Sequence, residues 1–376
     1  MSSDNNARLV LVSDFDQDKV NRFFRQEYPA SKADFLIRYG RWFYRELDEY
    51  NFVLVRDNGE IVGHAGGIPL YAMLDGQRQS VHWCIDLIVG AAHRALGYHR
   101  PLINDLQLIP ELGIGFPNEM SRLLLKRAGW RLRWDGLRFS MPLSPKGLAY
   151  LMRVQAAMKR PRKARRRSQK IRPRLQRLTG KAMQLAALSL SGPTMFWRRA
   201  RLGNYQPGTA RRIMQPDAEQ LADVFMRHTR PMPIMTIYRD ADYLRWRYLE
   251  SPFAAEMAYY VAGPDDAPTH VLITRTAVFR GLKITRILDL FGDLDDQDGL
   301  RDVIRLALRD AARAHSDLIT STAWLSSVIE SFRALDFWEV EQLVFGWYSK
   351  HGPEMMDRVE HTAYHWVMGD SDADPF

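Results

Sequence analysis

The sequence contains very little cysteine and no long apolar run. One cysteine, Cys84, stands among 376 residues, which excludes a disulfide framework and a zinc site built on several cysteines, and fits a reducing compartment. No stretch reaches the roughly eighteen apolar residues of a membrane-spanning helix. The first residues lack a basic segment followed by an apolar run, so we expect no signal peptide. These absences favour a cytoplasmic protein without a transmembrane segment.

Acidic residues are missing from one long part of the chain. Residues 136–216 contain no Asp or Glu but 20 Lys and Arg, and twelve of these lie between 159 and 181. The formal net charge of the whole chain is +9, so the remainder has a net charge of −11. The sequence therefore describes an acidic protein that carries one strongly basic segment.

The basic segment has the pattern of an interrupted amphipathic helix. Pro161 and Pro173 divide it, and one apolar stripe recurs at intervals of three and four residues. The stripe consists of Ile171, Leu175, Leu178, Ala182 and Leu185. Such a helix can lie on an anionic membrane surface through residues 159–181, which would place the protein at the inner face of the membrane. The same charge can bind tRNA or another nucleic acid, or remain a solvated arm packed on the acidic body.

Three groups of residues recur at a nearly constant distance of 203 to 208 positions. The pairs are Arg41–Tyr44 with Arg245–Tyr248, Cys84–Leu87 with Ile287–Leu290, and Gly129–Trp130 with Phe337–Trp338. Each match is weak alone, but the common offset indicates an ancestral duplication.

Each half shows the same order of expected elements, which begins with helices. In the first half we expect strands over 51–56, 61–68, 79–89 and 112–116, and helices over 101–108 and 119–128. In the second half we expect strands over 257–261, 271–279, 283–291 and 318–322, and helices over 300–314 and 326–335. Antiparallel strands followed by β-α-β-α predict an α+β fold, with a mixed, mostly antiparallel sheet flanked by helices in each half. We expect domains at 1–145 and 207–351, a basic helical insert at 146–206 and a tail at 352–376 with a disordered acidic end.

Two motifs in the first half resemble the GNAT acyltransferase family. Residues Arg94 to His99 are similar to its Arg/Gln-x-x-Gly-x-Gly/Ala loop, and residues Asn118 to Trp130 to its Asn-x-x-Ala/Ser-x-x-Leu-Tyr-x-Lys-x-Gly-Phe segment. The order of elements is also similar, and Gly115–Asn118 resembles a variant from polysaccharide and envelope gene clusters. The resemblance implies two GNAT-like domains and an acyl-CoA site in the first, where loop amides and a helix N-terminus hold the pyrophosphate. It places the CoA contacts at Val89, Arg94, Gly97, Tyr98, His99, Asn118 and Ser121.

The sequence departs from this family at several positions. His99 stands where the loop usually ends in Gly or Ala, and Leu125 replaces the Tyr that often protonates the departing CoA thiolate. Because Leu125 cannot donate a proton, another group or water must do so, or acetyl transfer is lost. In the second half, residues 293–298 include four Asp, which would repel a pyrophosphate. We therefore expect the second half to shape the acceptor cleft and not to bind acyl-CoA.

Acyl transfer to an amine needs a base and an acid. Asp86 lies on the strand that often supplies the base in GNAT enzymes, and His82 lies four residues earlier on the same face. Glu119 follows Asn118, and His64 is a further candidate. Each could equally be structural, since Asp289 occupies the place of Asp86 in the half that we expect to be inactive.

These observations lead to one main hypothesis with two alternatives. The main hypothesis is an acyl-CoA-dependent N-acyltransferase acting on an amine of a sugar, an amino acid or a lipid-linked envelope precursor. One alternative is an aminoacyl-tRNA-dependent transferase of the tandem type that builds peptidoglycan bridges. The other is a non-catalytic binding or assembly protein with two degenerate domains. We expect no metal cofactor, because residues 293–298 lack the spacing of a calcium loop.

Overall fold

The computed structural model describes residues 7–45, 50–108, 112–158, 193, 196–350 and 352–370. The first half contributes the strands β1 (Ala7–Leu11), β2 (Asn51–Arg56), β3 (Ile61–Leu74), β4 (Gln77–Val89), β5 (Leu112–Gly115) and β6 (Arg131–Pro142). The second half contributes the strands β7 (Arg211–Ile213), β8 (Ile234–Ile237), β9 (Met257–Ala262), β10 (His270–Phe279), β11 (Leu282–Gly292), β12 (Leu318–Ala323), β13 (Trp338–Tyr348) and β14 (Ala363–Tyr364).

Helices flank these strands in both halves. The first half contains α1 (Gln17–Glu27), α2 (Ala30–Phe43), α3 (His99–Leu108), α4 (Glu119–Arg127), α5 (Pro145–Met158) and the 3₁₀ helix η3 (Ala91–Leu96). The second half contains α8 (Ala218–Val224), α9 (Ala241–Leu244), α10 (Gln297–Arg313), α11 (Ser326–Ala334), α12 (Pro353–His361) and the 3₁₀ helix η7 (Met368–Asp370). The predicted fold class is confirmed: the chain has an α+β fold, in which a mixed, mostly antiparallel sheet is flanked by helices in both halves.

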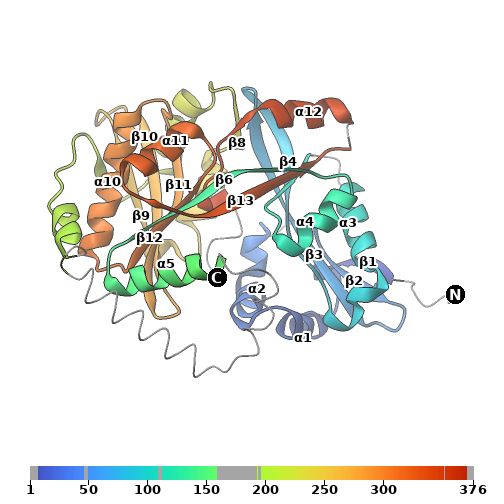
Figure 1. Ribbon diagram of the computed structural model, residues 1–376. Coiled ribbons are helices and arrows are strands. Elements are labelled where there is room, and N and C mark those ends of the chain that lie inside the picture. Colours follow the sequence, from blue (N-terminus) through green and yellow to red (C-terminus); the bar gives the residue numbers. More distant parts are fainter. Residues whose placement is uncertain are drawn as a thin grey trace.

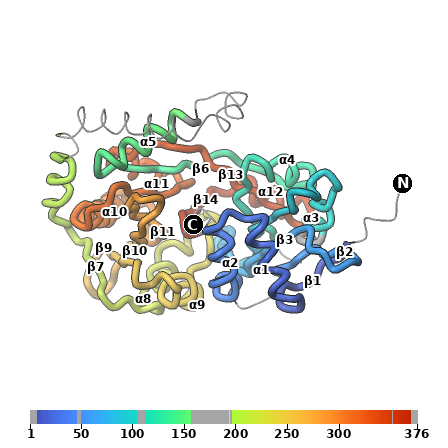
Figure 2. Tube along the Cα trace, turned by 90° about the horizontal axis from the view of Figure 1, so that it is seen from below, coloured from blue at the N-terminus to red at the C-terminus, as the bar shows by residue number. Residues whose placement is uncertain are grey.

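The strands form one sheet that runs through both halves. Its order is β1-β2-β3-β4-β5-β13-β6-β12-β11-β10-β9-β7, and β8 joins it at β3. In Figure 1 the first half lies on the right and the second on the left, with β6 and β13 crossing between them. The view from below in Figure 2 shows α1 and α2 on the first half and α8 to α10 on the second.

The two halves exchange a strand at the centre of the sheet. Strand β6 belongs to the first half in sequence but pairs antiparallel with β12 of the second. Strand β13 belongs to the second half but pairs antiparallel with β5 of the first. The exchanged strands also pair with each other along most of their length. The neighbour of β5 in the first half is therefore β13 of the second half, and the neighbour of β12 in the second half is β6 of the first.

A matching pair of strands diverges in each half. Strands β4 and β5 are parallel over three residue pairs that end at Trp83 and Ile114. Strands β11 and β12 are parallel over three pairs that end at Arg286 and Thr320. Trp83 and Arg286 are 203 positions apart, which is the offset of the sequence repeat. The divergence leaves a gap in the sheet of each half.

The repeat is also visible where the halves meet. Trp42 Nε1 donates a hydrogen bond of 3.0 Å to the carbonyl oxygen of Trp246, and Trp246 Nε1 donates one of 2.7 Å to that of Trp42. The two ring centroids lie 6.2 Å apart. Such a reciprocal contact between equivalent residues is what a local twofold relation produces, and it supports the duplication.

The C-terminal segment is part of the core as far as the structure describes it. His365 and Trp366 are fully buried, and α12 packs on β13. Residues 352–370 thus belong to the second half, while the expected disordered end at 371–376 lies outside the described residues.

Most of the basic insert also lies outside the described residues. Helix α5 begins it and packs on β6 and β13, but residues 159–192, with the predicted apolar stripe, are not described. In the part of the chain that is described, none of the helices combines the length and apolarity needed to cross a bilayer.

Candidate functional site

A cavity of about 710 Å³ opens in the first half where β4 and β5 diverge. Its walls come from the end of β4, the residues that follow β5, and the helices α3 and α4. Ile103, Leu124, Leu125 and Trp130 give it an apolar floor. The shape and lining suit a slender, largely apolar ligand that enters between two strands.

A β-bulge in β4 forms one wall of the cavity. His64 pairs with Ile88 and Gly66 pairs with Ile85, so Asp86 and Leu87 together face one residue of β3. Asp86 has φ of 59°, in the left-handed region. Bulges of this kind redirect the strand, and they often lie beside functional sites.

The carboxylate of Asp86 is bound by the protein itself. Lys32 Nζ lies 2.8 Å from Oδ1, and the Tyr44 hydroxyl donates to Oδ2 at 2.8 Å. Both side chains of the ion pair are largely buried. Asp289 of the second half has matching partners, since Arg239 and Tyr248 both donate to its carboxylate. The same arrangement recurs in the second half, which lacks the two GNAT-like motifs. We therefore infer that holding this carboxylate has a structural function in both halves.

Tyr28, which follows α1, reaches the cavity beside the bulge. Its hydroxyl donates to the carbonyl oxygen of Asp86 at 2.7 Å and lies 2.8 Å from His64 Nδ1. His64 Nε2 lies 2.7 Å from Asn51 Oδ1, so the chain of contacts continues away from the cavity. Burial raises the pKa of Tyr28 well above its usual value, with Asp86 adding to the effect, and burial lowers the pKa of His64 to about 4. Tyr28 therefore stays protonated and His64 stays neutral at physiological pH.

The loop that the sequence predicts to hold phosphate leads from β4 into α3. Arg94 lies in η3, where Nε donates to the carbonyl oxygen of Val89 at 3.1 Å. Gly97 ends η3 with φ of 84°, a conformation that favours glycine. Val89, Arg94 and His99 line the cavity, whereas Tyr98 is buried in a small cluster behind it.

The second predicted motif begins α4. Asn118 Oδ1 caps the helix by accepting from the backbone N–H of Met120 and Ser121. Asn118 and Ser121 line the cavity. The cap uses the side-chain oxygen, so the amide nitrogen takes no part in it. Glu119 is exposed in the first turn, between two residues of the cavity wall.

His82 lies deeper than the cavity wall. The side chain is 2% exposed, its ring stacks on Tyr50, and neither ring nitrogen has a hydrogen-bond partner among the described residues. Burial lowers its pKa to about 4 and raises the pKa of the Cys84 thiol, which does line the cavity. Both groups are therefore neutral near pH 7.

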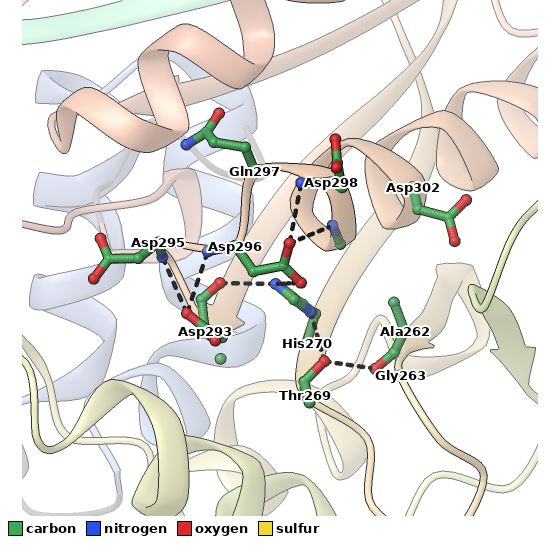
Figure 3. A network of polar contacts seen from close by, with 12 residues as sticks. Ala262, Gly263, Thr269, His270, Asp293, Asp295, Asp296, Gln297, Asp298 and Asp302 are labelled. Carbon is green, nitrogen blue, oxygen red and sulfur yellow. Dashed lines mark hydrogen bonds and ion pairs between the residues drawn. The ribbon is translucent and has the colours of Figure 1, made fainter.

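The corresponding loop of the second half binds its own carboxylates. Asp293 Oδ1 accepts from the backbone N–H of Asp295 and Asp296, each at 3.2 Å. Asp296 Oδ1 caps α10 by accepting from Asp298 and Gly299, each at 3.1 Å. Figure 3 shows these contacts around the buried His270, whose Nε2 donates to the carbonyl oxygen of Asp293. The backbone N–H groups of this loop that could bind a phosphate already donate to the carboxylates of Asp293 and Asp296. Within the described residues, no group of three His, Cys, Asp or Glu side chains could hold a metal ion.

The gap between β11 and β12 is filled from within the chain. His365 Nε2 donates to the carbonyl oxygen of Leu290, and Arg247 donates to that of Gly369. A Cβ on Gly369 would lie 2.6 Å from the Tyr248 hydroxyl and 2.8 Å from the carbonyl oxygen of Leu288. The segment of η7 thus occupies, in the second half, the place that the cavity has in the first.

The structure brings together most residues that the sequence suggested. Asp86 and five of the expected CoA contacts, namely Val89, Arg94, His99, Asn118 and Ser121, line one cavity. Gly97 borders it in the loop, while Tyr98 and His82 lie behind its walls. Sequence reasoning missed Tyr28, Lys32 and Glu27, which come from helices with no motif. A buried Lys in a largely apolar helix was the available signal for Lys32.

Comparison with known proteins bears on these observations. A model of the acetyltransferase (GNAT) family matches residues 17–107, which include α1 to α3 and the predicted phosphate loop. A search of curated protein sequences finds no match. The family match therefore covers part of the first half and supports the resemblance.

Solved structures match over nearly the whole chain. N-myristoyltransferase from Saccharomyces cerevisiae with bound myristoyl-CoA has a TM-score of 0.58 at 12% identity, over 93% of this chain and 83% of that one. A GCN5-related N-acetyltransferase from Anabaena variabilis has a TM-score of 0.55 at 13% identity, over 91% and 72%. The fold is a GNAT fold. At identities of 12% and 13% the similarity concerns the fold alone. It extends over the second half of the chain as well as the first.

Proposed function

We propose that the protein transfers an acyl group from acyl-CoA to an amine. The observation that carries this proposal is the apolar cavity at the divergence of β4 and β5, bordered by the GNAT-like loop and α4. A pantetheine arm is slender and carries amides, so it suits a gap that offers strand edges and the side chain of Asn118. The myristoyl-CoA bound by the structurally similar N-myristoyltransferase also favours an acyl-CoA donor.

The phosphate end of the donor would lie at the loop between β4 and α3. We assign the pyrophosphate to Arg94, Gly97 and His99, because a guanidinium, an open glycine and a helix N-terminus all favour an anion. Val89 would border the pantetheine arm, and Tyr98 would support the loop from behind. Asn118 and Ser121 would bind the arm from α4.

Tyr28 is our candidate for the acid that the Leu125 position lacks. When the amine attacks the thioester and the C–S bond breaks, the sulfur takes the Tyr28 proton and Glu119 takes the proton lost by the amine. Exchange with solvent then returns a proton to Tyr28 and removes one from Glu119. Tyr28 lines the cavity and stays protonated, since its pKa is raised. We assign Asp86 and His82 to positioning and keep Glu119, exposed in the first turn of α4, as the proposed base.

The acceptor is proposed as an amine of a sugar, an amino acid or a lipid-linked envelope precursor, held between the two halves. The second half would shape this acceptor site, because its own loop and gap are filled by Asp293, Asp296 and η7. The tRNA-dependent alternative predicts transfer from aminoacyl-tRNA and no CoA binding. A non-catalytic protein predicts no transfer at all.

Calorimetry with CoA, acetyl-CoA and myristoyl-CoA tests the donor site. We expect binding, and we expect Arg94→Ala to weaken it about tenfold, as loss of a charge-assisted contact does. Arg41→Ala, at an exposed position of α2, is the matched control. If the protein binds none of CoA, acetyl-CoA and myristoyl-CoA, the result contradicts the proposal.

A transfer assay with an amine library then tests Tyr28. We expect Tyr28→Phe to lower kcat about a hundredfold with little change in KM for the donor, since acid catalysis contributes about that factor. Tyr71→Phe, at an exposed position of β3, should leave kcat unchanged. An equal rate for Tyr28→Phe would remove Tyr28 from the chemistry.

The basic segment supports a separate proposal about location. Its twelve Lys and Arg between 159 and 181 would attract an anionic membrane, each contributing about 1 kcal/mol near the surface. Co-sedimentation with vesicles that contain phosphatidylglycerol, and its loss when six of these residues become Gln, would support a peripheral position. Binding of tRNA in place of vesicles would favour the tRNA-dependent alternative.

A further inference from the structure

A carboxylate from α1 lies against the loop after β4, beside Arg94. Glu27, the last residue of α1, accepts a hydrogen bond of 2.8 Å from the backbone N–H of Ala91 through Oε2. The same oxygen lies 3.9 Å from Arg94 Nη2. A Cβ on Gly90 would lie 3.4 Å from Glu27 Oε1, so the carboxylate packs directly on the loop backbone.

This contact involves Arg94, one of the residues to which we assign the pyrophosphate. A guanidinium favours an anion, and here a carboxylate already lies within ion-pair distance of it. The Glu27 side chain is 17% exposed, whereas that of Arg94 is 54% exposed and can turn toward an incoming ligand. A pyrophosphate placed here would meet a like charge at close range.

The second half gives an independent parallel. Its equivalent loop begins after Gly292, which is 203 positions from Val89. There the loop amides are taken by Asp293 and Asp296, whose carboxylates belong to the loop itself. In the first half the carboxylate comes from another helix, and a rotation of one side chain can withdraw it.

We propose that Glu27 is an internal competitor for the pyrophosphate and sets the affinity of the donor site for CoA. The inference rests on the proposed function, because it concerns the donor of that reaction. In the free protein Glu27 holds the loop through Ala91. When the donor binds, its pyrophosphate displaces the carboxylate from Arg94. Ligands without the pyrophosphate leave Glu27 in place.

Calorimetry with CoA, 3′-dephospho-CoA and pantetheine tests this inference on the full chain. We expect Glu27→Gln to tighten CoA and dephospho-CoA by about fivefold or more, since it removes one repelling charge. Pantetheine lacks both phosphates of the bridge, so its affinity should not change. Asp18→Asn makes the same charge change at an exposed position of α1 and should leave all three affinities unchanged.

Two results would overturn the inference. If Glu27 only braces the loop, Glu27→Gln and Glu27→Ala will weaken CoA or leave it unchanged while the wild type binds CoA. If neither the wild type nor the variants bind CoA, the proposed function fails together with this inference. Thermal unfolding of both variants checks that the loop effect is local, because Gln can still accept the Ala91 hydrogen bond.

Discussion

At the scale of single residues, Asp86 combines an unusual backbone conformation with a buried charge. Its φ of 59° lies where residues other than Gly and Asn are uncommon, and its carboxylate is held by Lys32 and Tyr44. Asp86→Asn keeps a residue that tolerates this conformation but leaves the Lys32 ammonium without its counter-charge. Breaking a buried ion pair in this way costs about 3–5 kcal/mol.

We therefore expect Asp86→Asn to lower the free energy of unfolding by several kcal/mol in urea titrations. The control Asp18→Asn, at an exposed position, should change it by less than about 0.5 kcal/mol. A catalytic base without a structural role would behave differently, since Asp86→Asn would then abolish transfer and leave stability unchanged.

The buried histidines make stability depend on pH. His82 has a pKa of about 4 in the folded protein, against about 6.5 when unfolded. Below pH 6.5 the unfolded chain binds a proton that folded His82 does not, so stability falls with decreasing pH until about pH 4. One such group contributes a slope of about 1.4 kcal/mol per pH unit.

His82→Leu should flatten this dependence by up to that amount in denaturant titrations between pH 7 and 5. Stability at pH 7 should change little, because the ring has no hydrogen-bond partner among the described residues. His361→Leu, at an exposed position of α12, should leave the slope as it is. His64 and His365 retain their own contributions in both variants.

The site could be predicted from the sequence where a motif carries the chemistry. Arg94, Gly97 and Asn118 stand at fixed spacings, because a loop and a helix cap need particular residues at particular positions. Tyr28 reaches the same cavity from the end of α1, and Glu27 reaches Ala91 and Arg94 of the loop, although both residues lie 66 to 91 positions earlier in the chain than these motif residues. Their contacts depend on how α1 packs against the sheet, and no local pattern encodes that packing.

At the scale of elements, local patterns predicted the strands β2 to β5 and β9 to β12 and the helices α3, α4, α10 and α11. The hairpin β2–β3 follows from the Asp57-Asn58-Gly59-Glu60 turn between apolar runs, and β9 to β12 follow from runs that contain aromatic and β-branched residues. Strand β3 extends six residues beyond the predicted end at Ile68. Strands β6 and β13 were not predicted, because charged residues such as Arg131 and Glu341 interrupt the alternation of apolar residues. Glu341 pairs with Arg138 across the exchanged strands, and Arg131 pairs with Asp357 of α12.

The segment of η7 provides a test at this scale. Gly369→Val would place a branched side chain against the Tyr248 hydroxyl and the Leu288 backbone, neither of which can move far in the core. We expect a loss of about 1–3 kcal/mol of stability, as overpacking typically gives. Donor binding at the first-half cavity should persist, since the substitution lies in the other half.

Gly40→Ala is the matched control for a glycine with open space around it. Nothing lies within 4 Å of a Cβ there, and the residue is inside α2, so Ala should stabilise by about 0.5–1 kcal/mol. A neutral Gly369→Val in thermal unfolding would mean that η7 does not fill the gap between β11 and β12.

At the scale of the whole molecule, the duplication was visible in the sequence but the strand exchange was not. Nearly equal offsets, 204 between Tyr44 and Tyr248 and 203 between Asp86 and Asp289, report common ancestry and fold. They do not say whether β6 stays beside β5 or crosses to β12, because both arrangements give the same local pattern. The exchange makes the sheet continuous and removes an open edge from each half.

The exchange predicts that neither half folds without the other. A fragment of residues 1–158 lacks β13, so β5 is left as an edge, and β6 has no partner. A fragment of residues 193–376 lacks β6 in the same way. Together the two fragments contain all described strands, and the break falls in the basic segment, outside them.

We expect each fragment alone to give a circular-dichroism spectrum without a cooperative thermal transition. Co-expressed, the fragments should co-purify as a 1:1 complex with one cooperative transition and with the CoA affinity of the intact chain. A matched control breaks the chain after residue 144, before α5, and should also reassemble, because β6 ends at Pro142. If residues 1–158 alone fold and bind CoA, the first half is an independent domain and the exchanged strands are dispensable for the donor site.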